Sequence, residues 1–232
     1  MRLLLGFLVG LVIAGIIAVT ALKVAWGDVT DLDSRDRGDD KTMTIDVGDF
    51  DRVSVAGVFE VDVTVGGDYA VTLSGKEDDL ARTSARVENG RLTLDTAKRN
   101  EGGKRKFVKH GVTAKISLPS LNAIEAAGVV DGDIQGIDAE SFSADISGVG
   151  ELTLSGNCGN FDAEVSGVGE LDANDLKCRS VKVDVSGVGS ASVYASESVD
   201  AELAGIGKIE IAGSPANVSK SQSSPFGRIS VK

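Results

Sequence analysis

The sequence predicts an all-β protein built as a parallel β-helix-like solenoid with coils of about 19–20 residues. Three observations predict this fold class. A Gly-x-Gly phrase recurs four times, with its first glycine 19, 20 and 18 positions after the previous one. Apolar and polar residues alternate on both sides of each phrase. Aromatic residues make up only 4% of the chain, so the core must consist mostly of Val, Ile, Leu and Ala.

An apolar stretch near the N-terminus predicts one hydrophobic helix ahead of the solenoid. Residues 3–22 carry no charge, and a helix of that length spans about 30 Å, the hydrocarbon thickness of a bilayer. Residues 1–27 are therefore either a single transmembrane anchor or a signal peptide, since Ala25 and Gly27 are small residues of the kind that a signal peptidase reads. Both alternatives place the remaining chain outside the cytoplasm. The first also makes the membrane a partner through residues 3–22.

Residues 28–43 form a predicted acidic spacer before the solenoid domain, which we place at residues 44–232. The spacer contains six aspartates and few large apolar side chains, so it cannot bury enough apolar surface to fold by itself. We therefore expect it to be solvated and to contribute nothing to the core.

Glycines mark the predicted corners of the solenoid. A chain that reverses within a few residues, between neighbouring chains above and below, needs positions that accept positive φ and lack a β-carbon. Aligning these glycines brings residues 50–59 into register with residues 121–130 and extends the repeat to six units. The predicted corners are Gly57, Gly128, Gly148, Gly167, Gly187 and Gly205. The residue after a corner is expected to point inward, which gives the column Val129, Val149, Val168, Val188 and Ile206.

Residues 67–118 interrupt the period and read as an irregular hairpin or cap region. Gly66-Gly67-Asp68 and Asn89-Gly90 each separate two alternating segments, which is typical of β-hairpins. We therefore expect antiparallel hairpins inserted near the N-terminal end of the solenoid. They either cap the first coil or project as an arm, and a cap is needed because an exposed terminal coil recruits other chains edge to edge.

The chain resembles a known bacterial family. The unit Gly57-Val58-Phe59 followed by alternating Val-Asp-Val-Thr-Val, the later Ser-Gly-Val-Gly coils and the exported N-terminus are similar to the family described as the putative autotransporter adhesin head domain, or GIN domain. The resemblance covers residues 46–231. It implies a right-handed parallel β-helix-like domain at the cell envelope, with no established enzymatic activity. Gly-Val-Phe stands where the family name implies Gly-Ile-Asn.

The two cysteines occupy nearly equivalent places in successive coils. Cys158 lies 10 residues after Gly148, and Cys178 lies 11 residues after Gly167. Stacked coils bring such positions about one strand spacing apart, within reach of a disulfide. We expect the two cysteines to pair in an oxidising compartment, and the alternative is a pair of reduced cysteines packed as small hydrophobic residues.

The glycine alignment also stacks acidic residues, which we call the acid column. Like charges about one strand spacing apart repel one another, so the column is a candidate site for a cation, and calcium is the natural one. The alternative is a solvated acidic face that keeps the sheet from aggregating. The acid column comprises Glu125, Asp145, Glu164, Asp184 and Glu202.

A basic stretch stands out in this acidic chain. Clustered cations act locally even on a chain of net negative charge, so the stretch is a candidate site for anionic polysaccharide, lipid headgroups or an acidic surface. The alternative is a solvated loop tip. The candidate residues are Lys104, Arg105, Lys106, Lys109 and His110.

Charge and composition argue against several functions. A net charge of -11 disfavours a nucleic-acid partner, because phosphate recognition needs a basic face. His110 is the only histidine and no Gly-x-Ser-x-Gly elbow occurs, which removes most Ser-His and Cys-His catalytic schemes and histidine-rich metal centres. We therefore expect no enzymatic activity, and no cofactor unless calcium occupies the acid column.

The leading functional interpretation is a non-enzymatic binding or adhesion-like module of the bacterial cell envelope. It would lie in the periplasm, or face it from an inner-membrane anchor, and bind envelope polysaccharide or protein. A structural scaffold that assembles by self-association is the second interpretation. A polysaccharide-acting β-helix enzyme is the third, because parallel β-helices host such enzymes.

Overall fold

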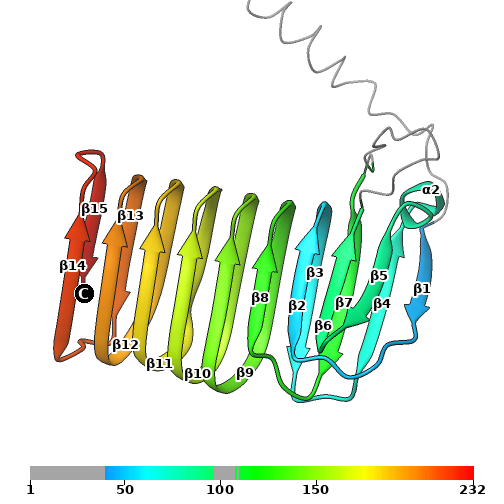
Figure 1. The fold of residues 1–232 in the computed structure, drawn as a ribbon, viewed down its shortest axis with the longest axis horizontal. Helices are drawn as coiled ribbons and strands as arrows, with labels where there is room; N and C mark the ends of the chain where they lie inside the picture. Colours follow the sequence, from blue (N-terminus) through cyan, green and yellow to red (C-terminus); the bar gives the residue numbers. More distant parts are fainter. Residues whose placement is uncertain (1–39, 97–107, 109) are drawn as a thin grey trace, which may run out of the picture. The chain divides into compact units, whose positions relative to one another are not determined.

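A computed structural model describes residues 40–96, 108 and 110–232 of the chain. The predicted hydrophobic helix, most of the acidic spacer and four residues of the basic stretch, Lys104, Arg105, Lys106 and Lys109, lie outside the described residues. Within the described part, no helix has the length and apolar character needed to cross a membrane. It is nearly all strand, with one short helix, α2 (Glu77–Leu80) (Figure 1).

Period-2 alternation produces the strands. In β10, Leu152 and Leu154 point inward and are fully buried, whereas Glu151 and Thr153, which precede them in the chain, are exposed. The strands are β1 (Lys41–Ile45), β2 (Arg52–Ala56), β3 (Val58–Val65), β4 (Ala70–Gly75), β5 (Ser84–Glu88), β6 (Arg91–Asp95), β7 (Val112–Leu118), β8 (Ala123–Ala126), β9 (Val129–Ile146), β10 (Val149–Val165), β11 (Val168–Val185), β12 (Val188–Leu203), β13 (Ile206–Ala212), β14 (Asn217–Gln222) and β15 (Gly227–Val231).

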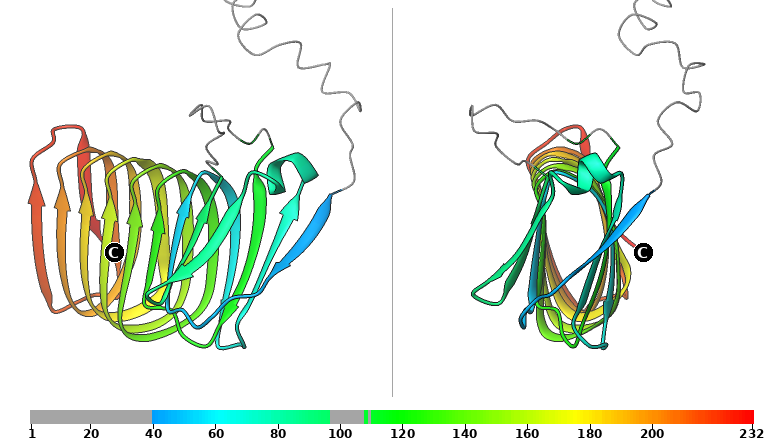
Figure 2. Two further views of the ribbon diagram at one scale, coloured as in Figure 1. Left: turned by 45° about the vertical axis from the view of Figure 1, so that its right-hand side comes forward. Right: turned by 90° about the vertical axis from the view of Figure 1, so that its right-hand side faces the viewer.

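Successive coils stack in parallel and in register, so the all-β solenoid is confirmed. Strands β9 to β12 each run through two straight segments and pair with their neighbours along both (Figure 1). Val149 lies opposite Val129 on one side and Val168 on the other. The alignment of residues 50–59 with residues 121–130 is also correct, because Val58 pairs with Val129. Seen end on, the coils form a flattened tube with two facing walls (Figure 2).

Small aliphatic side chains fill the space between the two walls. Leu152 from one wall and Ala163 and Val165 from the other are fully buried. Phe142 and Phe161 stack on each other with ring centroids 5.8 Å apart. Because small aliphatic residues recur from coil to coil, the two walls pack closely against each other.

Close backbone approach, rather than positive φ, explains the corner glycines. Of the six predicted corners only Gly57 has a positive φ, +132°. A β-carbon on Gly167 would overlap the carbonyl oxygen of Gly148 in the preceding coil. That oxygen also accepts the Val168 N–H at 2.9 Å, so the corner cannot move away without losing a hydrogen bond. The expectation of positive φ at every corner was wrong, and the requirement is the missing β-carbon.

Residues 67–118 contribute one more coil as well as antiparallel strands. β6 pairs in parallel with β2, and β7 pairs in parallel with β3, so the two strands form a coil beside β2 and β3. β4 and β1 then continue this sheet in antiparallel orientation, and β5 pairs with β6 through Asn89-Gly90. The hairpin predicted at Gly66-Gly67-Asp68 does not form, because β7 lies between β3 and β4. The parallel β7 supplies β3 with a neighbour at what would otherwise be a free edge.

The last described coil has two polar residues at inward positions of β14. β14 pairs with β12 and β15 pairs with β13, which ends the stack. Lys220 lies opposite Ala201, and Gln222 lies opposite Leu203, where Ala201 and Leu203 are fully buried. In-register neighbours face the same side, so a lysine and a glutamine occupy positions that are apolar one coil earlier. A further coil stacked over β14 would have to bury the charge of Lys220, whereas Val218, Phe226 and Val231 expose apolar surface on the same coil.

Candidate binding groove

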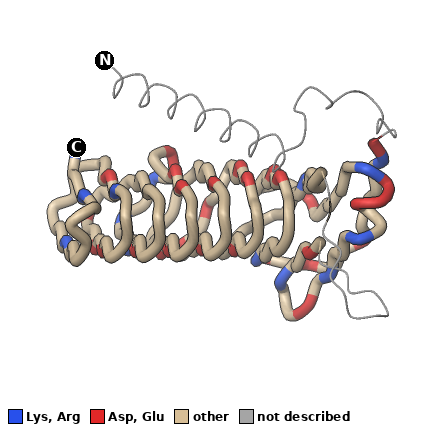
Figure 3. The backbone as a smooth tube through the Cα atoms, turned by 90° about the horizontal axis from the view of Figure 1, so that it is seen from above, with Lys and Arg blue, Asp and Glu red and all other residues tan. Residues whose placement is uncertain are grey.

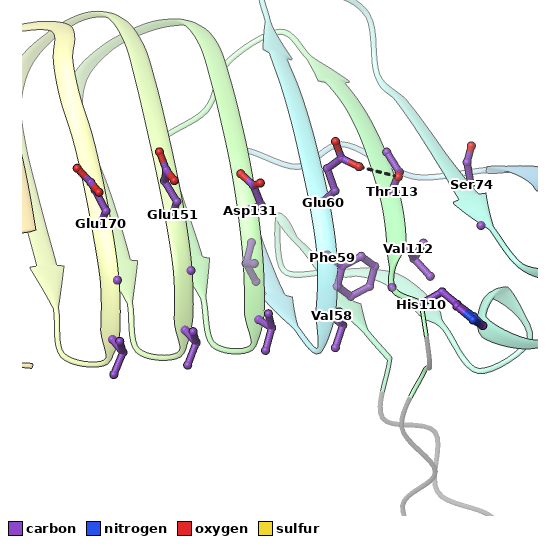
Figure 4. A pocket seen from close by; sticks show the side chains of 18 of the residues that line it. Val58, Phe59, Glu60, Ser74, His110, Val112, Thr113, Asp131, Glu151 and Glu170 are labelled. Atoms are coloured by element: carbon purple, nitrogen blue, oxygen red, sulfur yellow. Dashed lines mark hydrogen bonds between the residues drawn. The ribbon is translucent and has the colours of Figure 1, made fainter. Parts of the chain in front are cut away.

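A shallow groove of about 900 Å³ crosses the strands that follow the Gly corners, from β3 and β7 to β12 (Figure 4). One side of it is an apolar ridge, the valine ridge, defined as Val129, Val149, Val168 and Val188. These four side chains are 49–53% exposed, and Ile206 continues the ridge beyond the groove with 52% exposure.

The outward orientation of the valine ridge corrects the expectation that this column points into the core. Leu152 and Leu154 are inward, so strict alternation makes Gly150 inward and Val149 outward. Gly150 takes the inward position because a β-carbon there would overlap the carbonyl oxygen of Val130. Val130 and Phe59 occupy the equivalent inward position in the preceding coils and are buried, so the exclusion of a side chain begins at Gly150.

A row of carboxylates runs parallel to the valine ridge, two residues further along each strand. We call it the acid row; its members are Glu60, Asp131, Glu151 and Glu170. All four are exposed and pair in register from β3 to β11. Figure 4 shows them side by side, pointing to the same side of the sheet. The row continues as Ser190 and Lys208, so its negative charge is confined to one end.

The acid row is not neutralised by its surroundings. Over residues 40–96, 108 and 110–232, Asp131, Glu151 and Glu170 make no hydrogen bond or ion pair. Glu60 accepts a hydrogen bond from the Thr113 hydroxyl at 3.1 Å. Carboxylates about 4.8 Å apart repel each other by about 1 kcal/mol in water. A cationic group bound beside the row would relieve this repulsion. Acids recur in this way from coil to coil along the tube (Figure 3).

The groove ends at the coil that residues 67–118 supply. Lys76 and His110 line this end. The His110 backbone N–H donates to Asp79 Oδ2 at 3.1 Å, and the ring Nδ1 lies 3.2 Å from the same oxygen. Asp79 is 1% exposed, and Arg82 lies 3.7 Å from its other oxygen. A buried carboxylate therefore holds His110 at the end of the groove.

His110 is the one member of the basic stretch that the structure describes. Its side chain is 47% exposed and belongs to the groove end rather than to a free loop tip. The proposed anion-binding role of Lys104, Arg105, Lys106 and Lys109 stays a prediction.

The acid column is in register, as predicted, but within the described residues its members do not gather into a metal-binding group. Each member pairs with the next across neighbouring coils. The described residues contain no group of three or more His, Cys, Asp or Glu placed to hold a metal ion. Arg91 Nη1 instead contacts both carboxylate oxygens of Glu125, at 2.5 and 2.6 Å. Calcium binding by Glu125, Asp145, Glu164, Asp184 and Glu202 remains an untested prediction.

Asp145 is one of two members of the acid column with a buried, unsatisfied carboxylate oxygen. Its Oδ1, like that of Asp184, has no hydrogen-bond partner among the described residues. Burial raises the pKa of this carboxyl, the charge of Glu125 raises it further, and a hydrogen bond with Ser147 opposes both effects. The column is therefore a source of repulsion within the fold.

The predicted disulfide is confirmed. Cys158 and Cys178 lie opposite each other in β10 and β11, with their Cα atoms 4.5 Å apart, and form a disulfide. Both cysteines are buried, at the corner opposite the Gly phrases. The bond ties two successive coils together on the side away from the groove.

Sequence reasoning missed the acid row although a signal for it was present. The same glycine alignment that stacks Glu125 with Asp145 also stacks Glu151 with Glu170. Alternation counted back from Leu152 would have placed these residues on the same side as the valine ridge.

The fold and the groove define a class of protein: a short-coil β-solenoid that exposes a straight apolar ridge beside a row of exposed carboxylates. The chain belongs to the family described as "Putative auto-transporter adhesin, head GIN domain", whose model matches residues 49–215. No curated protein matches the chain in sequence.

Three solved structures are similar to the chain, each over 84% of its length. A putative adhesin from Bacteroides fragilis is 24% identical, with 98% of that chain covered and a TM-score of 0.67. A putative lipid binding protein from Parabacteroides distasonis is 18% identical, with 98% of that chain covered and a TM-score of 0.47. A putative adhesin from Parabacteroides merdae is 15% identical, with 97% covered and a TM-score of 0.43. The first likeness supports the fold.

Proposed function

We propose that the chain is a non-enzymatic binding module of the bacterial cell envelope, and that the groove is its binding surface. The observation that carries this proposal is the valine ridge. Four successive coils each expose about half of a valine at a position where the fold needs no apolar side chain. Contiguous apolar surface of this kind on a folded protein marks an interaction site.

An extracytoplasmic location fits three independent features. A disulfide between Cys158 and Cys178 persists in an oxidising compartment. Residues 1–27 have the composition of an anchor or signal peptide. The family description names an adhesin head, which is a surface role.

Binding ranks ahead of scaffolding by end-to-end assembly. Lys220 and Gln222 oppose stacking of a second molecule over β14, and the apolar surface of the last coil is limited to Val218, Phe226, Ile229 and Val231. The groove, by contrast, lies along the side of the tube, where it is open to a partner.

Co-sedimentation of the purified chain with a bacterial envelope fraction tests the proposal. The double variant Val149→Ser/Val168→Ser removes the centre of the valine ridge. Val218→Ser is the control, because Val218 is 40% exposed but lies outside the groove. We expect the double variant to lose most of the bound fraction and the control to retain it. Equal sedimentation of all three proteins, with unchanged circular dichroism, would refute the groove as the binding surface.

A further inference from the structure

We infer that the groove binds a cationic amphipathic α-helix of a partner protein or peptide, with apolar residues against the valine ridge and Lys or Arg side chains along the acid row. This inference rests on the proposed binding function and adds the chemistry of the partner. It combines three features of the groove: its two parallel rows, their charge, and the pairing of the strands beneath them.

The negative charge of the groove favours a positively charged partner. The groove is lined by the four members of the acid row; at one end lie His110 and an ion pair between Asp40 and Lys76, with Oδ1 and Nζ 3.0 Å apart. Such a surface repels phosphate and other anionic ligands, and attracts cations with unpaired carboxylates already exposed.

Strand pairing decides the conformation of the partner. An extended peptide binds a β-sheet by adding to a free edge, where main-chain hydrogen bonds hold it. The strands under the groove have no free edge: β10, for example, pairs with β9 on one side and β11 on the other. A helix satisfies its own backbone hydrogen bonds and needs only side-chain contacts, so it suits a fully paired sheet.

The spacing of the two rows matches a helix. Equivalent residues repeat about every 4.8 Å along the tube, close to the 5.4 Å pitch of an α-helix. The valine ridge and the acid row are two residues apart on each strand, about 6.6 Å, so one face of a helix about 10 Å wide can contact both rows. With Ile206 the ridge is about 19 Å long, so roughly thirteen helical residues cover it.

Fluorescence anisotropy with a labelled synthetic peptide tests the inference. The probe is an 18-residue helix with Leu at i, i+3, i+4 and i+7 spacing and Lys flanking the Leu face. The purified full chain is used in non-ionic detergent at low salt, and detergent blanks are subtracted. A peptide with Glu in place of Lys is the negative probe.

Paired variants of equal charge separate groove binding from general attraction to an acidic protein. Glu151→Gln/Glu170→Gln removes two charges from the acid row. Glu164→Gln/Glu202→Gln removes two exposed charges from the acid column, outside the groove. We expect the first pair to weaken binding roughly 2- to 30-fold and the second to leave it unchanged. Val149→Ser/Val168→Ser should weaken binding at least about tenfold, with Val218→Ser as its control.

Several outcomes would overturn the inference. Equal weakening by the two Gln pairs would mean that net charge alone attracts the peptide. No binding of the Lys peptide, or equal binding of the Glu peptide, would exclude a cationic helix. If the ridge variant still loses envelope binding in such a case, the proposed function stands and only the partner class is wrong. If the ridge variant changes neither assay, both proposals fail.

Discussion

Gly167→Ala is the substitution that tests most directly how the coils are held together. The added β-carbon would overlap the carbonyl oxygen of Gly148, which accepts the Val168 N–H at 2.9 Å. Overpacking of a rigid site costs about 1–3 kcal/mol, and the distorted hydrogen bond costs about 1 kcal/mol more. Loss of glycine's freedom in the unfolded chain offsets about 0.4–1 kcal/mol. We therefore expect a net loss of about 2 kcal/mol.

Thermal unfolding followed by circular dichroism measures this loss. For a domain of this size, 1 kcal/mol corresponds to roughly 2–4 °C, so the melting temperature should fall by about 4–8 °C. Gly48→Ala is the matched control, because an added β-carbon there meets no atom within 4 Å. The control should melt at the wild-type temperature or slightly above it. A Gly167→Ala protein that melts together with the control would refute close backbone approach as the reason for the corner glycines.

Two further predictions concern the disulfide and the acid column. Replacing Cys158 and Cys178 by Ser should lower the free energy of unfolding by about 3 kcal/mol, because the bond closes a loop with a sequence separation of 20. Urea unfolding with and without reductant checks this, and identical midpoints would contradict it. Asp145→Asn should raise the melting temperature at pH 7. The pKa of Asp145 is raised in the folded state, so folding disfavours the ionised carboxylate. The wild-type protein therefore loses stability as the pH rises from the pKa of Asp145 in the unfolded chain through its pKa in the folded protein. The gain from Asn should therefore vanish below about pH 4, and a gain independent of pH would contradict this cause.

Repetition made much of the fold readable from the sequence. A phrase that returns once per coil defines which residues become vertical neighbours, so the pairing of Val58 with Val129 and of Cys158 with Cys178 followed from alignment alone. The aliphatic core followed from alternation and from the scarcity of aromatic residues. These features depend on periodicity along the chain, which the linear sequence shows directly.

The order of strands near the N-terminal end was not readable in the same way. Gly66-Gly67-Asp68 has the composition of a hairpin turn, but β7, which lies more than forty residues further along the chain, takes the place beside β3. A turn sequence specifies a local change of direction. Which strand fills the neighbouring edge depends on competition between distant segments for the same hydrogen bonds.

The coil length, the stacked columns and the disulfide could be predicted from the repeats, because each coil repeats the same contacts with its neighbours. Only the folded structure shows whether the column of side chains next to the Gly corners faces the core or the solvent. There the backbones approach so closely that Gly150 must occupy the inward position and Val149 is left outside. The column predicted to lie in the core is therefore the exposed valine ridge. The distance between backbones in adjacent coils arises only when the coils pack, so the sequence pattern does not show it.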